Sequence, residues 1–143
     1  MTRTVVIGIG NDYRGDDAIG LAVARLLRGV TYAEVVENGG DPIALIDAWT
    51  GADLAIVIDA TRSGCPPGTV TVHDGLHAEP TGHGSTHALS LADAIELGRA
   101  LDRLPARLVV IGIEGADFTL GAPLSPPVEA TLPEIARTIE ATA

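Results

Sequence analysis

Carboxylate side chains follow the apolar runs of this sequence. Asp16 and Asp17 come after residues 4–9, and Asp59 comes directly after residues 54–58. Carboxylates can hold a divalent metal ion or act as general acids and bases. If the two runs are parallel strands of one sheet, their carboxyl ends meet at one edge, and the acidic side chains face a common crevice there.

A histidine is available to complete such a site. Three of the four histidines are expected to be ordinary surface residues, whereas His87 stands directly before a predicted helix, in the segment STHALSLADAIELG. Two carboxylates and one imidazole from three separate loops form a facial ligand set for a borderline divalent ion such as zinc or nickel. From spacing alone, a metal site formed by Asp17, Asp59 and His87 is the less favoured interpretation.

The glycines after the first apolar run suggest a nucleotide-binding loop, but their spacing does not fit one. A dinucleotide-binding fingerprint requires G-x-G-x-x-G, and here Gly8 and Gly10 are followed by Tyr13 at the third glycine position. Asp16 and Asp17 would also repel a bound pyrophosphate by about 4 kcal/mol per charge pair at an effective dielectric constant of about 20. Nucleotide binding is therefore disfavoured. Asp16 is instead expected to cap the following helix, which leaves Asp17 without a structural role.

The elements that must position these residues alternate along the chain. The apolar runs expected to be strands are residues 4–9, 35–36, 54–58, 69–73 and 108–113. The amphipathic runs expected to be helices are residues 19–28, 42–49, 91–101 and 132–139. Strands alternating with helices imply right-handed crossovers. The sequence therefore predicts one α/β domain over residues 1–143, a three-layer α/β/α fold with a mainly parallel, possibly mixed, sheet of about five strands.

Local signals mark the ends of several elements. Asp41 before Pro42 is typical of a helix N-terminus, with the aspartate as N-cap and the proline at the first helical position. Ser90 and Asp93 match a capping box at the start of the third helix, although that helix could begin as early as Ser85. The strand over residues 69–73 alternates apolar and polar residues, which is typical of a strand at or near a sheet edge.

Composition and charge exclude several function classes. Nine basic and nineteen acidic residues give a net charge of −10, which disfavours binding to a phosphate backbone. No apolar stretch approaches the roughly 20 residues that a membrane span needs, and no secretion signal is visible. Cys65 is the single cysteine and cannot form an internal disulfide. We therefore expect a cytoplasmic protein that neither binds nucleic acid nor inserts into a membrane.

Four segments resemble the motifs of the hydrogenase maturation protease family. GIGNDYRGDDAIG is similar to the first motif of the family, G-x-G-N followed after four residues by Asp and then Asp or Glu. AIVIDATRSGCPPGT resembles the second motif, a strand that ends in Asp-Ala with Pro-Gly-Thr downstream. STHALSLADAIEL and VVIGIEGADFTLGAPLSPPVEA resemble the third and the last. The four segments occur in the order found in the family and span essentially the whole chain.

The resemblance implies an endopeptidase that removes a short C-terminal extension from the nickel-loaded precursor of a [NiFe] hydrogenase large subunit. It implies that Asp17, Asp59 and His87 contact nickel that the substrate supplies, with no organic cofactor. These three residues and Asp16 are the catalytic candidates, and Asp16 could be a base or only a cap. The identity of the base is left open.

Two positions depart from the family pattern, and one alternative function remains. Ala18 stands where the family often has glycine, and Asn38 stands where it often has an acidic residue, so no carboxylate acts at that position. A nickel-binding chaperone or sensor would use the same three ligands without cleaving a substrate. The sequence specifies neither the hydrogenase, nor the scissile bond, nor the oligomeric state.

Overall fold

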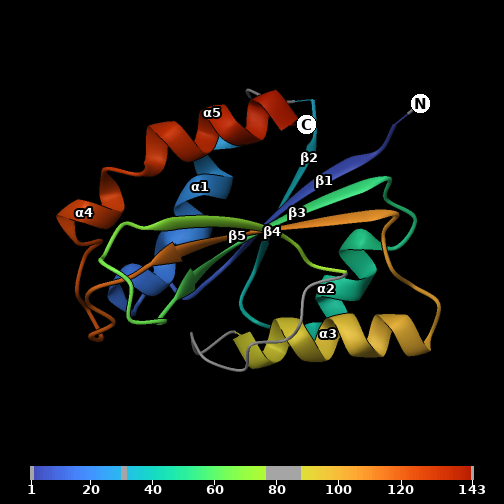
Figure 1. The fold of residues 1–143 in the computed structure, drawn as a ribbon, viewed down its shortest axis with the longest axis horizontal. Coiled ribbons are helices and arrows are strands. Elements are labelled where there is room, and N and C mark those ends of the chain that lie inside the picture. The colour runs from blue at the N-terminus through green and yellow to red at the C-terminus, as the bar shows by residue number, and fades with distance from the viewer. Residues whose placement is uncertain (1, 30–31, 77–87, 143) are drawn as a thin grey trace.

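A sheet with helices on both faces forms the centre of the molecule (Figure 1). The structure, a computed structural model, describes residues 2–29, 32–76 and 88–142. Its five described strands are β1 (Thr4–Ile9), β2 (Glu34–Asn38), β3 (Leu54–Thr61), β4 (Val70–Asp74) and β5 (Arg107–Glu114), in the order β2-β1-β3-β5-β4. β4 pairs with β5 antiparallel, and the other pairs are parallel. The expected α/β fold with a mainly parallel, mixed sheet is confirmed.

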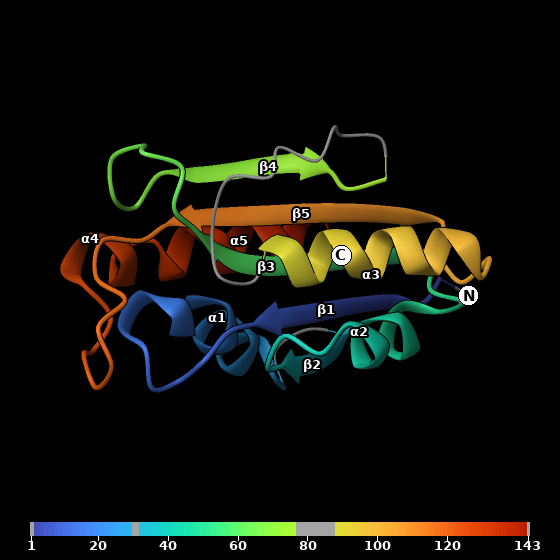
Figure 2. The same ribbon diagram turned by 90° about the horizontal axis from the view of Figure 1, so that it is seen from below.

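Helices cover the two faces of the sheet. The described helices are η1 (Gly15–Ala18), α1 (Ile19–Leu27), α2 (Pro42–Trp49), α3 (Ala88–Ala100), α4 (Pro126–Glu129) and α5 (Leu132–Thr142). α1 and α5 lie on one face, and α2 and α3 lie on the other (Figures 1 and 2). Among the described residues, no helix combines the length and the apolar character that crossing a bilayer would require.

Alternate residues of the central strands fill two separate cores. On β3, Ile56 and Ile58 pack in the core on the side of α1 and α5, whereas Val57 packs in the core that contains Trp49 of α2. Successive side chains of a strand point to opposite faces of the sheet. Asp59 therefore lies on the same face of β3 as Val57, the face that α2 and α3 cover.

The boundaries of two elements differ from those expected. β3 continues to Thr61, so Asp59 lies within the strand, opposite Gly112 of β5, because β5 offers a partner along the full length of β3. α3 begins at Ala88, which places Ser90 inside the helix, so the capping box predicted at Ser90 is wrong. The N-cap predicted at Asp41 is confirmed, because its carboxylate accepts a hydrogen bond from a backbone N–H of α2 at 3.0 Å.

Close backbone contacts fix α1 against the sheet. A Cβ atom added at Gly20 of α1 would overlap the carbonyl oxygen of Ile9 and lie 2.5 Å from that of Ile58. A Cβ atom at Gly8 of β1 would likewise overlap the carbonyl oxygen of Gly20. The helix backbone therefore rests directly on the ends of β1 and β3. This contact places η1, which directly precedes α1, at the carboxyl ends of these two strands.

A Gly20→Ala variant is expected to lose about 3 kcal/mol or more of unfolding free energy, because backbone carbonyls cannot move aside for the added methyl group. Denaturant unfolding measures this loss. Gly39→Ala is the matched control, since no heavy atom lies within 4 Å of the corresponding Cβ position. Equal stability of the two variants would show that the α1 contact tolerates a side chain.

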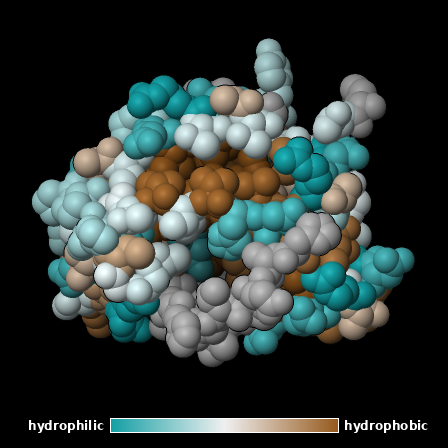
Figure 3. All heavy atoms as spheres, viewed as in Figure 1, coloured by the Kyte–Doolittle hydropathy of each residue, from teal (hydrophilic) through white to brown (hydrophobic). Residues whose placement is uncertain are grey.

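One flank of the molecule exposes apolar surface. Figure 3 shows a hydrophobic, hollowed area between α5 and the β4 edge of the sheet. Val70, Val109, Leu132 and Ala136 are partly buried against the core on the α1 and α5 side, and Val72 of β4 is 56% exposed. The strand predicted at or near a sheet edge is confirmed as an edge strand, since β4 ends the strand order and pairs only with β5 in the described sheet.

Candidate functional site

β1, β3 and β5 end at one edge of the sheet (Figure 2), and buried carboxylates lie in the segments at that edge. Asp16 and Asp17 belong to η1, which follows β1, while Asp59 lies near the end of β3 and Glu114 ends β5. These four side chains have between 0% and 4% of their surface exposed. The acidic residues therefore share one edge, as expected from the parallel order of the strands.

Asp16 holds the loop after β5 in place. Its carboxylate accepts hydrogen bonds from the N–H of Ala116 at 2.7 Å, the N–H of Asp117 at 2.9 Å, and both the N–H and the hydroxyl of Ser125 at 2.7 Å. η1 is preceded by Arg14 at its N-cap, and neither η1 nor α1 has a side-chain cap. The expectation that Asp16 caps the helix is therefore wrong. The side chain instead binds backbone about a hundred residues away, where no local sequence signal points.

These hydrogen bonds keep Asp16 ionised. Burial alone would raise the pKa of the carboxyl group, but the hydrogen bonds from Ser125, Asp117 and Ala116 outweigh burial and lower the pKa below its ordinary value of 3.8. A carboxylate that is stabilised by four donors is a weak proton acceptor. The geometry thus gives Asp16 a structural role at this edge.

Glu114 plays a similar part for the turn after β3. Both of its carboxylate oxygens lie 3.0 Å from the N–H of Ser63, and one of them accepts hydrogen bonds from the hydroxyls of Ser63 at 2.6 Å and Thr61 at 3.1 Å. Burial would raise the pKa of Glu114, but these donors lower it below 4.5. No local sequence signal indicates that Glu114 binds the turn that follows another strand.

Acid is expected to destabilise the protein through these two carboxylates. The pKa of each is lower in the folded state, so their contribution to stability is present above the unfolded pKa values of 3.8 and 4.5 and is lost as the pH falls through the folded values. We expect the melting temperature to fall below about pH 4. An Asp16→Asn/Glu114→Gln variant should be less stable at pH 7 and less sensitive to acid. Asp93→Asn, on the exposed side of α3, is the control, and an unchanged acid dependence in the double variant would contradict the prediction.

Asp17 and Asp59 lie where η1 crosses the end of β3. Asp17 is 2% exposed and stands three residues before Gly20, whose contact with the strand carbonyls fixes the position of η1. Asp59 is 4% exposed, and its carboxylate accepts the N–H of Ala60 at 2.8 Å. Backbone packing therefore brings together the two segments that carry these aspartates.

The third predicted ligand, His87, lies outside the described residues. It directly precedes α3, whose start lies at the carboxyl edge and whose end leads back to the start of β5 (Figure 2). In the part of the chain that the structure describes, no three His, Cys, Asp or Glu residues are grouped so as to hold a metal ion. The joining of His87 with Asp17 and Asp59 stays a prediction, and the start of α3 on the face of Asp59 supports it.

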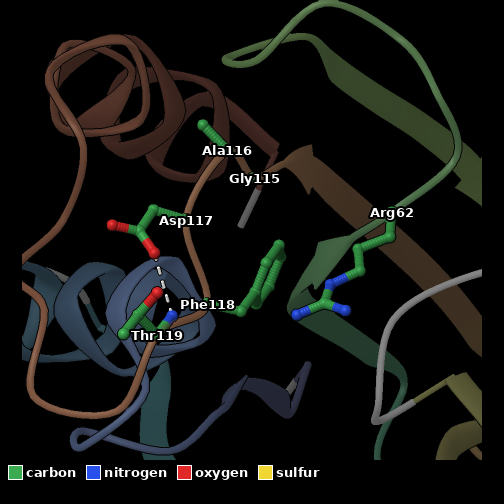
Figure 4. Close-up of a pocket in the computed structure, with 6 residues that line it drawn as sticks. All are labelled: Arg62, Gly115, Ala116, Asp117, Phe118 and Thr119. Carbon is green, nitrogen blue, oxygen red and sulfur yellow. Dashed lines mark hydrogen bonds between the residues drawn. The ribbon is translucent and has the colours of Figure 1, made fainter.

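An open hollow of about 530 Å³ lies at the same edge, lined by Arg62 and residues 115–119 (Figure 4). The guanidinium of Arg62 lies 3.9 Å from the ring centroid of Phe118, a cation–π contact. Gly115 makes room for the ring, because a Cβ atom there would overlap it. The carboxylate of Asp117 accepts a hydrogen bond from the N–H of Thr119 at 2.9 Å. The hollow gives this edge a concave, polar surface beside the loop that Asp16 holds.

Asn38 closes a turn near the end of β1. Its side-chain oxygen accepts hydrogen bonds from the N–H groups of Gly40 at 2.6 Å and Asp41 at 2.9 Å, and its backbone carbonyl accepts the N–H of Gly10 at 3.0 Å. An amide suits this arrangement because the same side chain also donates to the carbonyl of Asp41 at 3.3 Å. Asn38 therefore has a structural explanation in this chain.

Comparisons with known proteins agree on one family. The model of the hydrogenase maturation protease family matches residues 21–142. The chain is 28% identical over 137 residues to the hydrogenase 2 maturation protease of Escherichia coli (strain K12), covering 91% of this chain and 84% of that protein. The matched family range includes Asp59 and His87 and begins after Asp17.

Solved structures extend the similarity over nearly the whole chain. The hydrogenase maturating endopeptidase HybD from Escherichia coli has a TM-score of 0.86 at 26% identity, covering 99% of this chain and 91% of that one. The [NiFe] hydrogenase maturation protease HybD from Thermococcus kodakarensis has a TM-score of 0.82 at 27% identity, covering 99% of both chains. The structural match thus includes the β1–η1 segment that precedes the range of the family model.

Proposed function

The chain belongs to the hydrogenase maturation protease family, and we propose that it removes a C-terminal extension from the nickel-loaded precursor of a [NiFe] hydrogenase large subunit. It is an endopeptidase of hydrogenase maturation, so its reaction is the hydrolysis of a peptide bond. One observation of the molecule carries the finer proposal. Asp17 and Asp59 are both almost completely buried, and α1 packing holds their segments together at the edge of the sheet where α/β folds bind their substrates.

We assign recognition of the nickel to Asp17, Asp59 and His87. The nickel belongs to the substrate, and its positive charge attracts carboxylates. Carboxylate oxygens and an imidazole nitrogen are suitable partners for a borderline ion. Because the close contact at Gly20 fixes η1, Asp17 is positioned before the substrate arrives, which lowers the cost of ordering the site.

Hydrolysis requires a proton acceptor at this edge. The water oxygen bonds to the scissile carbonyl carbon and loses a proton, the C–N bond breaks, and the leaving amine gains a proton. Asp16 is a poor base, because four donors already occupy its carboxylate and lower its pKa. We therefore assign the proton transfer to the group formed by Asp17, Asp59 and His87.

Processing of the precursor tests the proposal directly. The purified protein is mixed with the nickel-loaded precursor of a large subunit, and mass spectrometry follows the loss of the C-terminal extension. Cleavage at a single bond is the expected result. Binding of the precursor with no cleavage at any enzyme concentration would favour the nickel-binding chaperone instead.

A further inference from the structure

Two large apolar side chains project into solvent beside the candidate site. Tyr13 is 74% exposed and Leu120 is 75% exposed. Tyr13 lies three residues before Asp16, in the segment that links β1 to η1, and Leu120 lies three residues after Asp117, in the segment that follows β5. Both segments lie at the carboxyl edge of the sheet, beside η1 (Figures 1 and 2).

Hydrogen bonds join these two segments into one unit. The N–H of Gly121 donates to the carbonyl oxygen of Tyr13 at 2.7 Å, so the backbones that carry the two side chains are in direct contact. The N–H of Asp16 also donates to the carbonyl oxygen of Asp117 at 2.8 Å, in addition to the bonds that the Asp16 carboxylate accepts from the same segment. The spacing of Tyr13 and Leu120 is therefore set by the fold.

A further set of contacts anchors the segment of Tyr13. The guanidinium of Arg25 on α1 binds both carboxylate oxygens of Asp12, at 2.8 and 2.7 Å, and also binds Glu37 at 2.7 Å. The side-chain oxygen of Asn11 accepts the N–H of Tyr13 at 2.9 Å. The backbone on both sides of Tyr13 is thus restrained while its ring stays in water, so little backbone freedom remains to be lost when a partner binds.

Tyr13 and Tyr32 are the two exposed aromatic residues of the chain. The sequence contains four aromatic residues, of which Trp49 and Phe118 are buried. Exposed tyrosine on a restrained backbone is typical of the residues that contribute most to protein interfaces. The chain carries a net charge of −10, which would repel an acidic partner. An apolar contact between the chain and its partner does not depend on charge attraction, and its strength is insensitive to screening by salt.

We propose that Tyr13 and Leu120 form a docking surface for the folded body of the large-subunit precursor. This inference rests on the proposed function, because that activity brings a protein partner to the carboxyl edge. The surface is continuous with the site, since the segment of Tyr13 leads into Asp16 and Asp17 and the Asp16 carboxylate binds the segment of Leu120. The precursor bound at Asp17 and Asp59 would therefore lie against Tyr13 and Leu120.

The test compares matched substitutions at the two ends of the sheet. Tyr13→Ser and Leu120→Ser, alone and together, are compared with Tyr32→Ser and Leu101→Ser. Tyr32 precedes β2 and Leu101 follows α3, so both exposed controls lie at the opposite, amino edge. For each variant we measure the Kd for nickel-loaded precursor and the KM and kcat of processing, after thermal unfolding has shown that it folds.

The double variant at the docking surface is expected to weaken precursor binding and raise KM about tenfold or more, equally at low and high salt. The two control variants should remain within about twofold of the original protein. A double variant that matches the controls in Kd and KM would overturn the docking surface. The proposed function would stand in that case, because its own test is cleavage by the unchanged protein. If the unchanged protein bound the precursor without cleaving it, the proposed function would be wrong. The Kd values of the variants would still show whether Tyr13 and Leu120 contact the precursor.

Discussion

An Asp59→Asn variant is expected to fold normally and to lose processing activity by about a thousandfold or more. Asparagine has nearly the same shape as aspartate, and its side-chain oxygen can still accept the N–H of Ala60, which the carboxylate accepts at 2.8 Å. The substitution removes the negative charge that we assign to contact with the substrate nickel. Asp17→Asn should have an effect of similar size, because the proposed site needs both carboxylates.

Processing of the nickel-loaded precursor, followed by mass spectrometry, measures the loss. Asp93→Asn is the matched control, since it removes one carboxylate from the exposed side of α3. Thermal unfolding separates loss of activity from loss of fold. Normal processing by a folded Asp59→Asn protein would exclude Asp59 from the site and would leave the ligand assignment without support.

Precursor without nickel is expected to resist cleavage under conditions in which the nickel-loaded form is fully processed. In the proposal, Asp17, Asp59 and His87 recognise the substrate by contacting its nickel ion. Two carboxylates and an imidazole bind nickel more weakly than the cysteine thiolates of a hydrogenase active site, so the ion should stay on the substrate. The purified protease should therefore carry little stoichiometric metal.

The two precursor forms are processed side by side, after the protease has been treated with a chelator that is then removed. Chelation should not affect cleavage of the nickel-loaded form. Equal cleavage of both forms would show that the protease does not need nickel to recognise the precursor. Activity that is lost on chelation and restored by zinc alone would make the protein a metallopeptidase with an ion of its own.

The sequence alone determined the fold class and the edge of the sheet at which the acidic residues of the candidate site lie. Apolar runs alternating with amphipathic helices specify a mainly parallel sheet, and the aspartates after two of these runs had to meet at the carboxyl edge. Local sequence signals also predicted the N-cap at Asp41 correctly, because its hydrogen bond joins residues that are neighbours in the chain. The motif resemblance added a family, which the comparisons confirm.

Only the tertiary structure decided what each side chain at that edge does. The partners of the Asp16 carboxylate lie 100 to 109 residues away along the chain, and Ser63 lies 51 residues from Glu114. Such contacts form when the chain closes on itself, and residue spacing does not encode them. Tertiary packing also decides which side chains are exposed to solvent, because Tyr13 would be buried if another loop packed against it. Local sequence indicates which segments form strands and helices, whereas the tertiary structure fixes the order of the strands in the sheet and the long-range hydrogen bonds by which carboxylates hold the loops.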